Sequence, residues 1–86
     1  MGLDSVELIM NVERAFDIEL PDPEISKVVT VGDFYDLIIV KLELNNPNID
    51  RQEVWETLSK LIVKISGVAP HRIVREARIV KDLGID

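Results

Sequence analysis

Residues 50–66 constrain the fold more strongly than any other stretch of the sequence. Their apolar side chains recur at the spacing of one helix face, and they are Val54, Leu58, Leu61, Ile62 and Ile65. Asp50 and Glu53 stand where a capping box begins a helix, and Gly67 follows where helices commonly end. The stretch therefore predicts an amphipathic helix whose apolar face must pack against other elements.

A second helix is expected over residues 4–17. Its apolar residues approximate a buried stripe, and Asp4 with Glu7 forms a start that resembles a capping box. The proline-containing segment after this helix breaks it, because proline restricts both its own backbone and that of the preceding residue. A short helical turn is expected over residues 23–28.

Residues 30–42 predict a third long helix, which Thr30 and Asp33 begin. The run Ile38-Ile39-Val40 also suits a strand, so a strand stays open for that short run. Residues 43–49 form a polar linker that contains a proline. Because short connections usually join antiparallel neighbours, we expect the helices on either side of the linker to lie antiparallel.

The last part of the chain, from Val68 to Asp86, is loop-like and carries a basic cluster. The cluster consists of His71, Arg72, Arg75, Arg78 and Lys81. Glu76 and Asp82 interrupt it and no aromatic residue joins it, so nucleic-acid binding is not expected. The cluster is expected to solvate the loop or to pair with acidic residues of the first quarter, in its own or another chain.

The fold class expected from these patterns is all-α. Three main helices and a short fourth predict a small four-helix bundle in a single domain over residues 1–86. A chain of this size buries only about 60% of its unfolded surface, which argues against a deep enzyme cleft. The sequence has no cysteine and one histidine. It offers no nucleophile–histidine–acid set, so no catalytic or metal-binding residue is nominated and the protein is not expected to be an enzyme.

The net charge of the chain lies almost entirely in its first quarter. Residues 1–24 hold seven acids and one base, whereas residues 25–86 are balanced, and the formal net charge is −6. Such a field repels nucleic acid and attracts basic surfaces. The acids either keep the protein soluble or form a docking face, and their one-sided distribution favours docking. No signal-peptide pattern or membrane-length apolar run is present, so a cytoplasmic protein is expected.

The two ends of the sequence carry two pieces of one motif. The chain opens on Met1-Gly2-Leu3-Asp4-Ser5-Val6-Glu7-Leu8 and closes on Lys81-Asp82-Leu83-Gly84-Ile85-Asp86. Together these pieces resemble the acyl carrier protein family, in which Asp-Leu-Gly-x-Asp-Ser-Leu-Asp-x-Val-Glu-Leu leads from a loop into a helix. In that family the serine carries 4'-phosphopantetheine. The resemblance implies a circularly permuted carrier fold: residues 1–42 resemble the family's second half, 43–49 form the linker, and 50–86 resemble its first half.

Two registers of this resemblance give different attachment positions. Aligned without gaps on Val6-Glu7-Leu8, the family serine falls on Gly2, which has no oxygen to form a phosphodiester, and Asp86 matches the preceding aspartate. The rival register places the serine at Ser5, but three residues must then be missing after it. Three residues rotate a helix by about 300° and shorten it by about 4.5 Å. The gapless register is preferred, and Ser5 remains the alternative.

The resemblance implies two functions of different classes. In the first, the chain is a carrier-like module that docks basic partner enzymes through its acidic helix and has no efficiently attached arm, so no cofactor is expected. In the alternative, it is a functional acyl carrier protein with 4'-phosphopantetheine on Ser5, serving fatty-acid, polyketide or related acyl metabolism. In either case Asp86 should lie near Gly2, at the start of the first helix.

The resemblance also implies the partners. They are the basic surfaces of acyl-handling enzymes or of a phosphopantetheinyl transferase, whereas nucleic acid and membranes are not expected. The residues expected to bind them are Asp4, Glu7, Met10, Glu13, Asp17 and Glu19. A monomer is expected, and a swapped dimer is the alternative.

Overall fold

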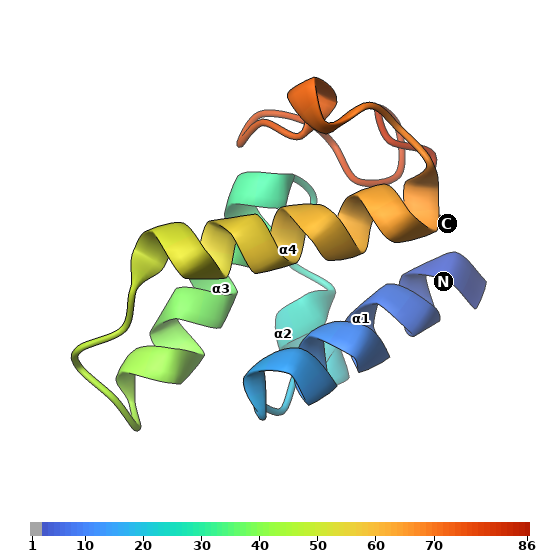
Figure 1. The fold of residues 1–86 in the computed structure, drawn as a ribbon. Coiled ribbons are helices and arrows are strands. Elements are labelled where there is room, and N and C mark those ends of the chain that lie inside the picture. Colours follow the sequence, from blue (N-terminus) through green and yellow to red (C-terminus); the bar gives the residue numbers. More distant parts are fainter. Residues whose placement is uncertain (1–2) are drawn as a thin grey trace.

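The computed structural model describes residues 3–86, and this part of the chain is helical throughout its regular elements (Figure 1). The elements are α1 (Leu3–Phe16), α2 (Asp22–Ile25), α3 (Val31–Glu43), α4 (Arg51–Ser66) and a short 3₁₀ helix, η1 (Pro70–Arg72). The strand left open within α3 does not form. Across residues 3–86 the β pairing consists of one isolated bridge between Thr30 and Arg78. The expected all-α bundle of three long helices and a short fourth is confirmed.

The ends of α3 and α4 follow from their capping residues. The Thr30 hydroxyl accepts from the Asp33 N–H at 3.0 Å, and the Asp33 carboxylate accepts from the Thr30 N–H at 3.1 Å. The Asp50 carboxylate accepts from the backbone N–H groups of Gln52 and Glu53. Helix α4 ends at Gly67, whose φ of 74° lies in the left-handed region that favours glycine.

The expected capping of α1 by Asp4 is wrong, because the helix already includes Leu3 and Asp4 lies inside its first turn. The helix ends at Phe16, since Asp17 adopts a left-handed conformation with φ 54°. The short side chain of aspartate tolerates this conformation better than most others do. Residues 17–21 then lead into α2.

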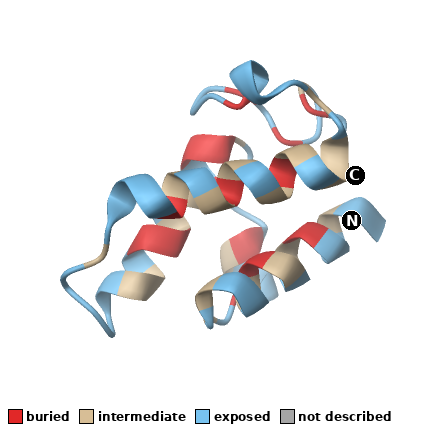
Figure 2. Ribbon diagram, in the orientation of Figure 1, coloured by how far each residue is buried: buried red, intermediate tan, exposed pale blue. Residues whose placement is uncertain are grey.

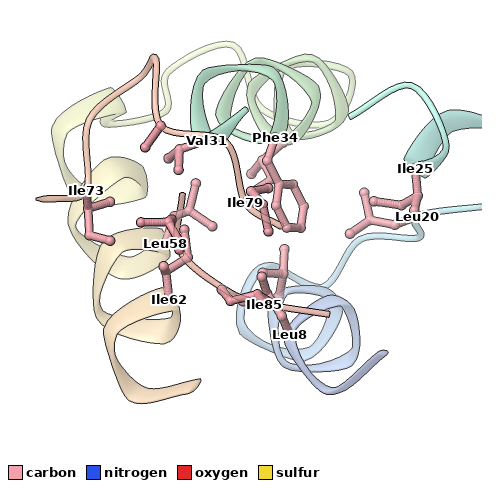
Figure 3. Close-up of a cluster of buried hydrophobic side chains, with 14 of the residues drawn as sticks. Leu8, Leu20, Ile25, Val31, Phe34, Leu58, Ile62, Ile73, Ile79 and Ile85 are labelled. Atoms are coloured by element: carbon pink, nitrogen blue, oxygen red, sulfur yellow. The ribbon is translucent and has the colours of Figure 1, made fainter. Parts of the chain in front are cut away.

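The three long helices share one hydrophobic core, as predicted. Leu8 of α1, Phe34 of α3 and Leu58 of α4 each expose 2% or less of their surface. Figure 2 shows buried and exposed positions alternating along each long helix, as the amphipathic pattern requires. Figure 3 shows the buried side chains of all three helices converging with isoleucines from the last segment of the chain.

The segment 73–85 belongs to the core, which the sequence pattern did not indicate. Its buried residues are Ile73, Ala77, Ile79, Leu83 and Ile85. The segment is held to the start of α3 by backbone hydrogen bonds, because the first N–H groups of a helix have no partner within it. The N–H of Val31 donates to the Ala77 carbonyl and the N–H of Gly32 to the Arg75 carbonyl, each at 2.9 Å.

The chain reverses between α3 and α4 through residues 44–50, and the two helices are in contact. The expected antiparallel arrangement of these helices is wrong. Figure 1 shows them crossing obliquely instead of lying alongside one another. The more extensive packing of α4 is against α1. No helix within residues 3–86 is both long enough and apolar enough to cross a membrane.

Candidate functional site

The end of the chain lies at the start of α1. The Ser5 N–H donates to the Asp86 carbonyl at 3.2 Å. The preceding Ile85 is fully buried, and Figure 3 shows its side chain beside that of Leu8. The expected meeting of the two ends is confirmed for Asp86, whereas Gly2 lies outside the described residues. Two segments that are far apart in the sequence therefore meet at the first turn of this helix.

The Ser5–Asp86 hydrogen bond gives a partner to one of the N–H groups at the start of α1. In an uninterrupted α-helix, each N–H donates to the carbonyl of the residue four positions earlier. The Ser5 N–H, in the first turn of α1, donates to the Asp86 carbonyl from the other end of the sequence. Gly84, with φ 70°, provides the turn just before this point.

A cleft of about 500 Å³ opens beside this helix start. Its walls are mostly apolar and come from α1, α2, the connection after α2, α3 and residues 78–81, with Leu8, Ile9, Ile25, Val28, Phe34 and Ile79 among them. Ser5 and Asp86 also line it, as do the basic residues Arg78 and Lys81. The volume lies in the range of small-molecule sites, and the lining suits an apolar chain with a polar end.

The exposed face of α1 is apolar along its centre. Leu3, Val6 and Met10 expose 88%, 42% and 45% of their surface, and they follow one another at helical spacing. Exposed Glu7 borders them, and exposed Arg14 lies one turn beyond Met10. The charge of this face is therefore less uniformly acidic than the sequence suggested.

The acidic residues expected to dock partners lie in different surroundings. The Glu13 carboxylate accepts from the Leu20 N–H at 2.9 Å and so holds the turn after α1. Asp17 and Glu19 are exposed in that turn, whereas Asp4 and Glu7 are exposed in α1 itself. Sequence reasoning counted Glu13 as free charge because nothing in the local pattern shows that its carboxylate caps a backbone group seven residues later.

The basic cluster pairs with acidic residues of its own chain, but among the described residues its ion pairs include none with the acids of residues 3–24. Arg75 bonds the Asp36 carboxylate at 2.8 Å, and Arg78 bonds Asp82 at 3.2 Å. Arg78 also lowers the pKa of Asp82, through its guanidinium and its backbone N–H. His71 is exposed, as expected. Two of the five basic residues, Arg75 and Arg78, therefore help to hold the loop in place.

Within residues 3–86, no group of three or more His, Asp or Glu residues is placed to hold a metal ion. The polar residues around the start of α1 offer a hydroxyl, a carboxylate and two cations, without a histidine beside them. This arrangement suits binding or attachment of a ligand.

Comparison with known proteins finds relatives named acyl carrier protein, among them proteins from three bacteria. The one from Clostridium acetobutylicum is 58% identical over 37 residues, which are 43% of this chain and 48% of that protein. The one from Prochlorococcus marinus is 51% identical over 40 residues, 46% of this chain and 50% of the relative. The one from Wolinella succinogenes is 58% identical over 32 residues, 37% and 42% of the two chains.

The chain spans about half the length of the curated relatives it matches. No family model matches it, and no solved structure matches it.

Proposed function

We propose, from the relationship of this chain to acyl carrier proteins, that it is a carrier-like docking module in which the family's two halves are exchanged in order. It binds basic surfaces of acyl-handling enzymes through α1, and it has no efficiently attached phosphopantetheine arm. It acts through protein contact and not as a catalyst.

The observation that carries this proposal is the hydrogen bond from the Ser5 N–H to the Asp86 carbonyl at 3.2 Å. The gapless register leaves Met1 unassigned and has the order Asp86, Gly2, Leu3, Asp4, Ser5, so Asp86 is the fourth residue before Ser5 in that register. That is the partner an α-helix requires. In the rival register Asp86 duplicates Asp4 and has no assigned place. The bond therefore supports the exchanged order and the gapless register together.

The gapless register has a direct chemical consequence. Attachment of the arm needs a hydroxyl, and Gly2 has none. Ser5 lies three residues further along the helix, which is about 300° of rotation and about 4.5 Å of rise. A transferase aligns the coenzyme A phosphate with the attacking oxygen, and errors of about 1 Å in such geometry cost about 100-fold in rate. Ser5 is therefore a poor substitute for the family serine.

The docking surface in this proposal is the exposed face of α1. Its centre is the stripe of Leu3, Val6 and Met10, which suits a shallow apolar groove on the partner. The acids of residues 1–24 attract the basic rim of such a groove and raise the rate of encounter. A phosphopantetheinyl transferase is one partner of this kind.

A second candidate function rests on the apolar cleft. Ser5 lines this space of about 500 Å³, so an arm attached to Ser5 would begin beside a site that can shelter an acyl chain. The chain would then be a working acyl carrier protein with 4'-phosphopantetheine as its cofactor.

Mass spectrometry distinguishes the two functions. The chain is incubated with coenzyme A and a promiscuous transferase, beside the variants Gly2→Ser and Ser5→Ala. The proposal expects no added mass on the wild type and full modification of Gly2→Ser, which persists in the double variant with Ser5→Ala. Complete modification of the wild type that Ser5→Ala abolishes would establish the second function instead.

A further inference from the structure

The chain's one tryptophan and one tyrosine meet on a surface away from the start of α1. Tyr35 of α3 and Trp55 of α4 pack edge to face, with ring centroids 5.3 Å apart. The Arg75 guanidinium lies over the Tyr35 ring, 5.7 Å from its centroid. Together with Arg51 and Gln52, these residues line a cleft of about 330 Å³, hereafter the aromatic–arginine cleft. Three separate parts of the fold build it.

Backbone contacts fix the position of Arg75 in this cleft. Its carbonyl accepts from the Gly32 N–H at 2.9 Å, and its Cβ lies against Gly32 so closely that a Cβ added there would be 3.2 Å away. The Tyr35 hydroxyl in turn donates to the Arg51 carbonyl at 3.3 Å. The backbone that carries these side chains is therefore already held in place by hydrogen bonds. Less conformational entropy is then lost when a partner binds.

Both arginines keep binding capacity despite their existing ion pairs. Arg51 pairs with Glu43 at 3.0 Å and Arg75 with Asp36 at 2.8 Å, while the arginine side chains remain 60% and 53% exposed. A guanidinium has five N–H donors, and exposed ion pairs of this kind contribute little to stability. A carboxylate from outside can therefore join or displace either partner.

We propose that the aromatic–arginine cleft is a second docking surface, and that its occupant is an acidic peptide segment of a partner protein. Carboxylates of the segment bond Arg51 and Arg75, and an apolar side chain between them lies against Trp55. Tryptophan, tyrosine and arginine dominate binding energy at protein interfaces. Residues 1–24 carry the net negative charge and repel an acidic segment. At the cleft the charges of Arg51 and Arg75 are balanced by Glu43 and Asp36, so the segment meets less repulsion there than at the exposed face of α1. The inference does not depend on the register or on the arm.

Fluorescence of Trp55 tests the proposal on the full chain, because the protein has no other tryptophan. The probe is a capped peptide of alternating Glu and Leu, and the matched probe replaces each Glu with Gln. We expect the Glu peptide to change the Trp55 fluorescence in a saturable way. Arg51→Gln and Arg75→Gln should each bind this peptide about tenfold more weakly, because each variant loses roughly one charge-assisted hydrogen bond. The control variant Lys64→Gln, at an exposed lysine in the last turn of α4, should bind like the wild type.

Arg75→Gln also removes the ion pair between the segment 73–85 and Asp36 of α3. Arg51→Gln instead removes the ion pair with Glu43, which does not involve that segment. Circular dichroism confirms that each variant is folded before titration. The proposal is overturned if the Glu and Gln peptides bind equally, or if no saturable fluorescence change occurs. It is also overturned if Arg51→Gln binds like the wild type, or if Lys64→Gln weakens binding as much as the cleft variants do.

Discussion

The Thr30 side chain contributes to stability by closing the start of α3. Its hydroxyl accepts from the Asp33 N–H at 3.0 Å, and that donor has no partner within the helix. We expect Thr30→Ala to lower the free energy of unfolding by about 1 kcal/mol. Urea denaturation measures the change, and Thr30→Ser, which keeps the oxygen, should lose much less. Equal losses in the two variants would show that the methyl group and not the cap matters here.

The reciprocal residue, Asp33, gives the protein a dependence on pH. Hydrogen bonds from the backbone N–H groups of Thr30 and Val29 lower its pKa in the folded state. The unfolded chain therefore takes up this proton at a higher pH than the folded chain does. The stabilisation is fully present above the unfolded pKa of about 3.9 and is lost as pH falls through the lower folded value.

Asp33→Asn isolates this dependence. Below about pH 4, the stability of the variant should fall less steeply with decreasing pH than that of the wild type. Urea midpoints across the acid range provide the measurement, and the difference between the two curves removes the titration of the other carboxylates. Parallel curves would mean that the Asp33 carboxylate makes no net contribution to folding.

Between elements, the attachment of segment 73–85 to α3 depends on Gly32. A Cβ at this position would lie 3.1 Å from the Arg75 carbonyl oxygen, so the loop backbone would have to move and the Gly32–Arg75 hydrogen bond would lengthen. We expect Gly32→Ala to destabilise the protein by about 1–3 kcal/mol, although alanine is the better helix former. Thermal unfolding provides the measurement.

Gly67→Ala is the comparison for Gly32→Ala, because it tests conformation without crowding. Within residues 3–86, a Cβ added at Gly67 would meet no non-neighbouring atom closer than 4 Å, but its φ is +74°. The expected cost is about 1–2 kcal/mol from the left-handed backbone alone. A higher melting temperature of Gly32→Ala would show that the loop backbone at Arg75 can move away from the added Cβ at little cost in free energy.

These elements also show how far the sequence predicts the structure. Periodicity and capping residues predicted α3 and α4, because both signals are local. The burial of Ile73 and Ile79 has no local signal, since neither lies in a regular element and their contacts are made with distant residues. The exchanged motif correctly placed Asp86 at the start of α1. The charge count, in contrast, could not separate exposed Glu7 from Glu13, which caps a turn.

At the scale of the whole molecule, the uneven charge predicts a salt-sensitive association. Glu7→Lys with Asp17→Lys should slow binding to a phosphopantetheinyl transferase about tenfold at low salt, with a smaller effect at physiological salt, where the Debye length is about 8 Å. Glu13 is left intact because its carboxylate bonds the Leu20 N–H. Stopped-flow rates at two salt concentrations measure the effect, and Glu56→Lys, exposed on α4, is the matched control. A rate independent of both the variant and salt would remove α1 as the docking element.

The proposed exchange of the two halves predicts that the chain can be rejoined. A rearranged protein would begin at Ile49, run to Asp86, continue directly at Gly2 and end at Leu44. The proposed register makes Asp86 and Gly2 consecutive, so the Ser5–Asp86 hydrogen bond becomes an ordinary bond between residues four apart in one helix. The severed connection, residues 45–48, is exposed, and such sites tolerate new ends best.

We expect the rearranged protein to fold with the same helix content by circular dichroism, and with a free energy of unfolding within about 1 kcal/mol of the parent. The covalent bond between Asp86 and Gly2 prevents the two ends from separating. The entropic cost of closing a loop changes only slowly with the length of the loop. A matched rearrangement with three extra residues between Asp86 and Gly2 should be less stable, because the insertion displaces Asp86 from the helix position that Ser5 requires. Greater stability of the version with the insertion would contradict the gapless register and the assignment of Gly2 to the attachment position.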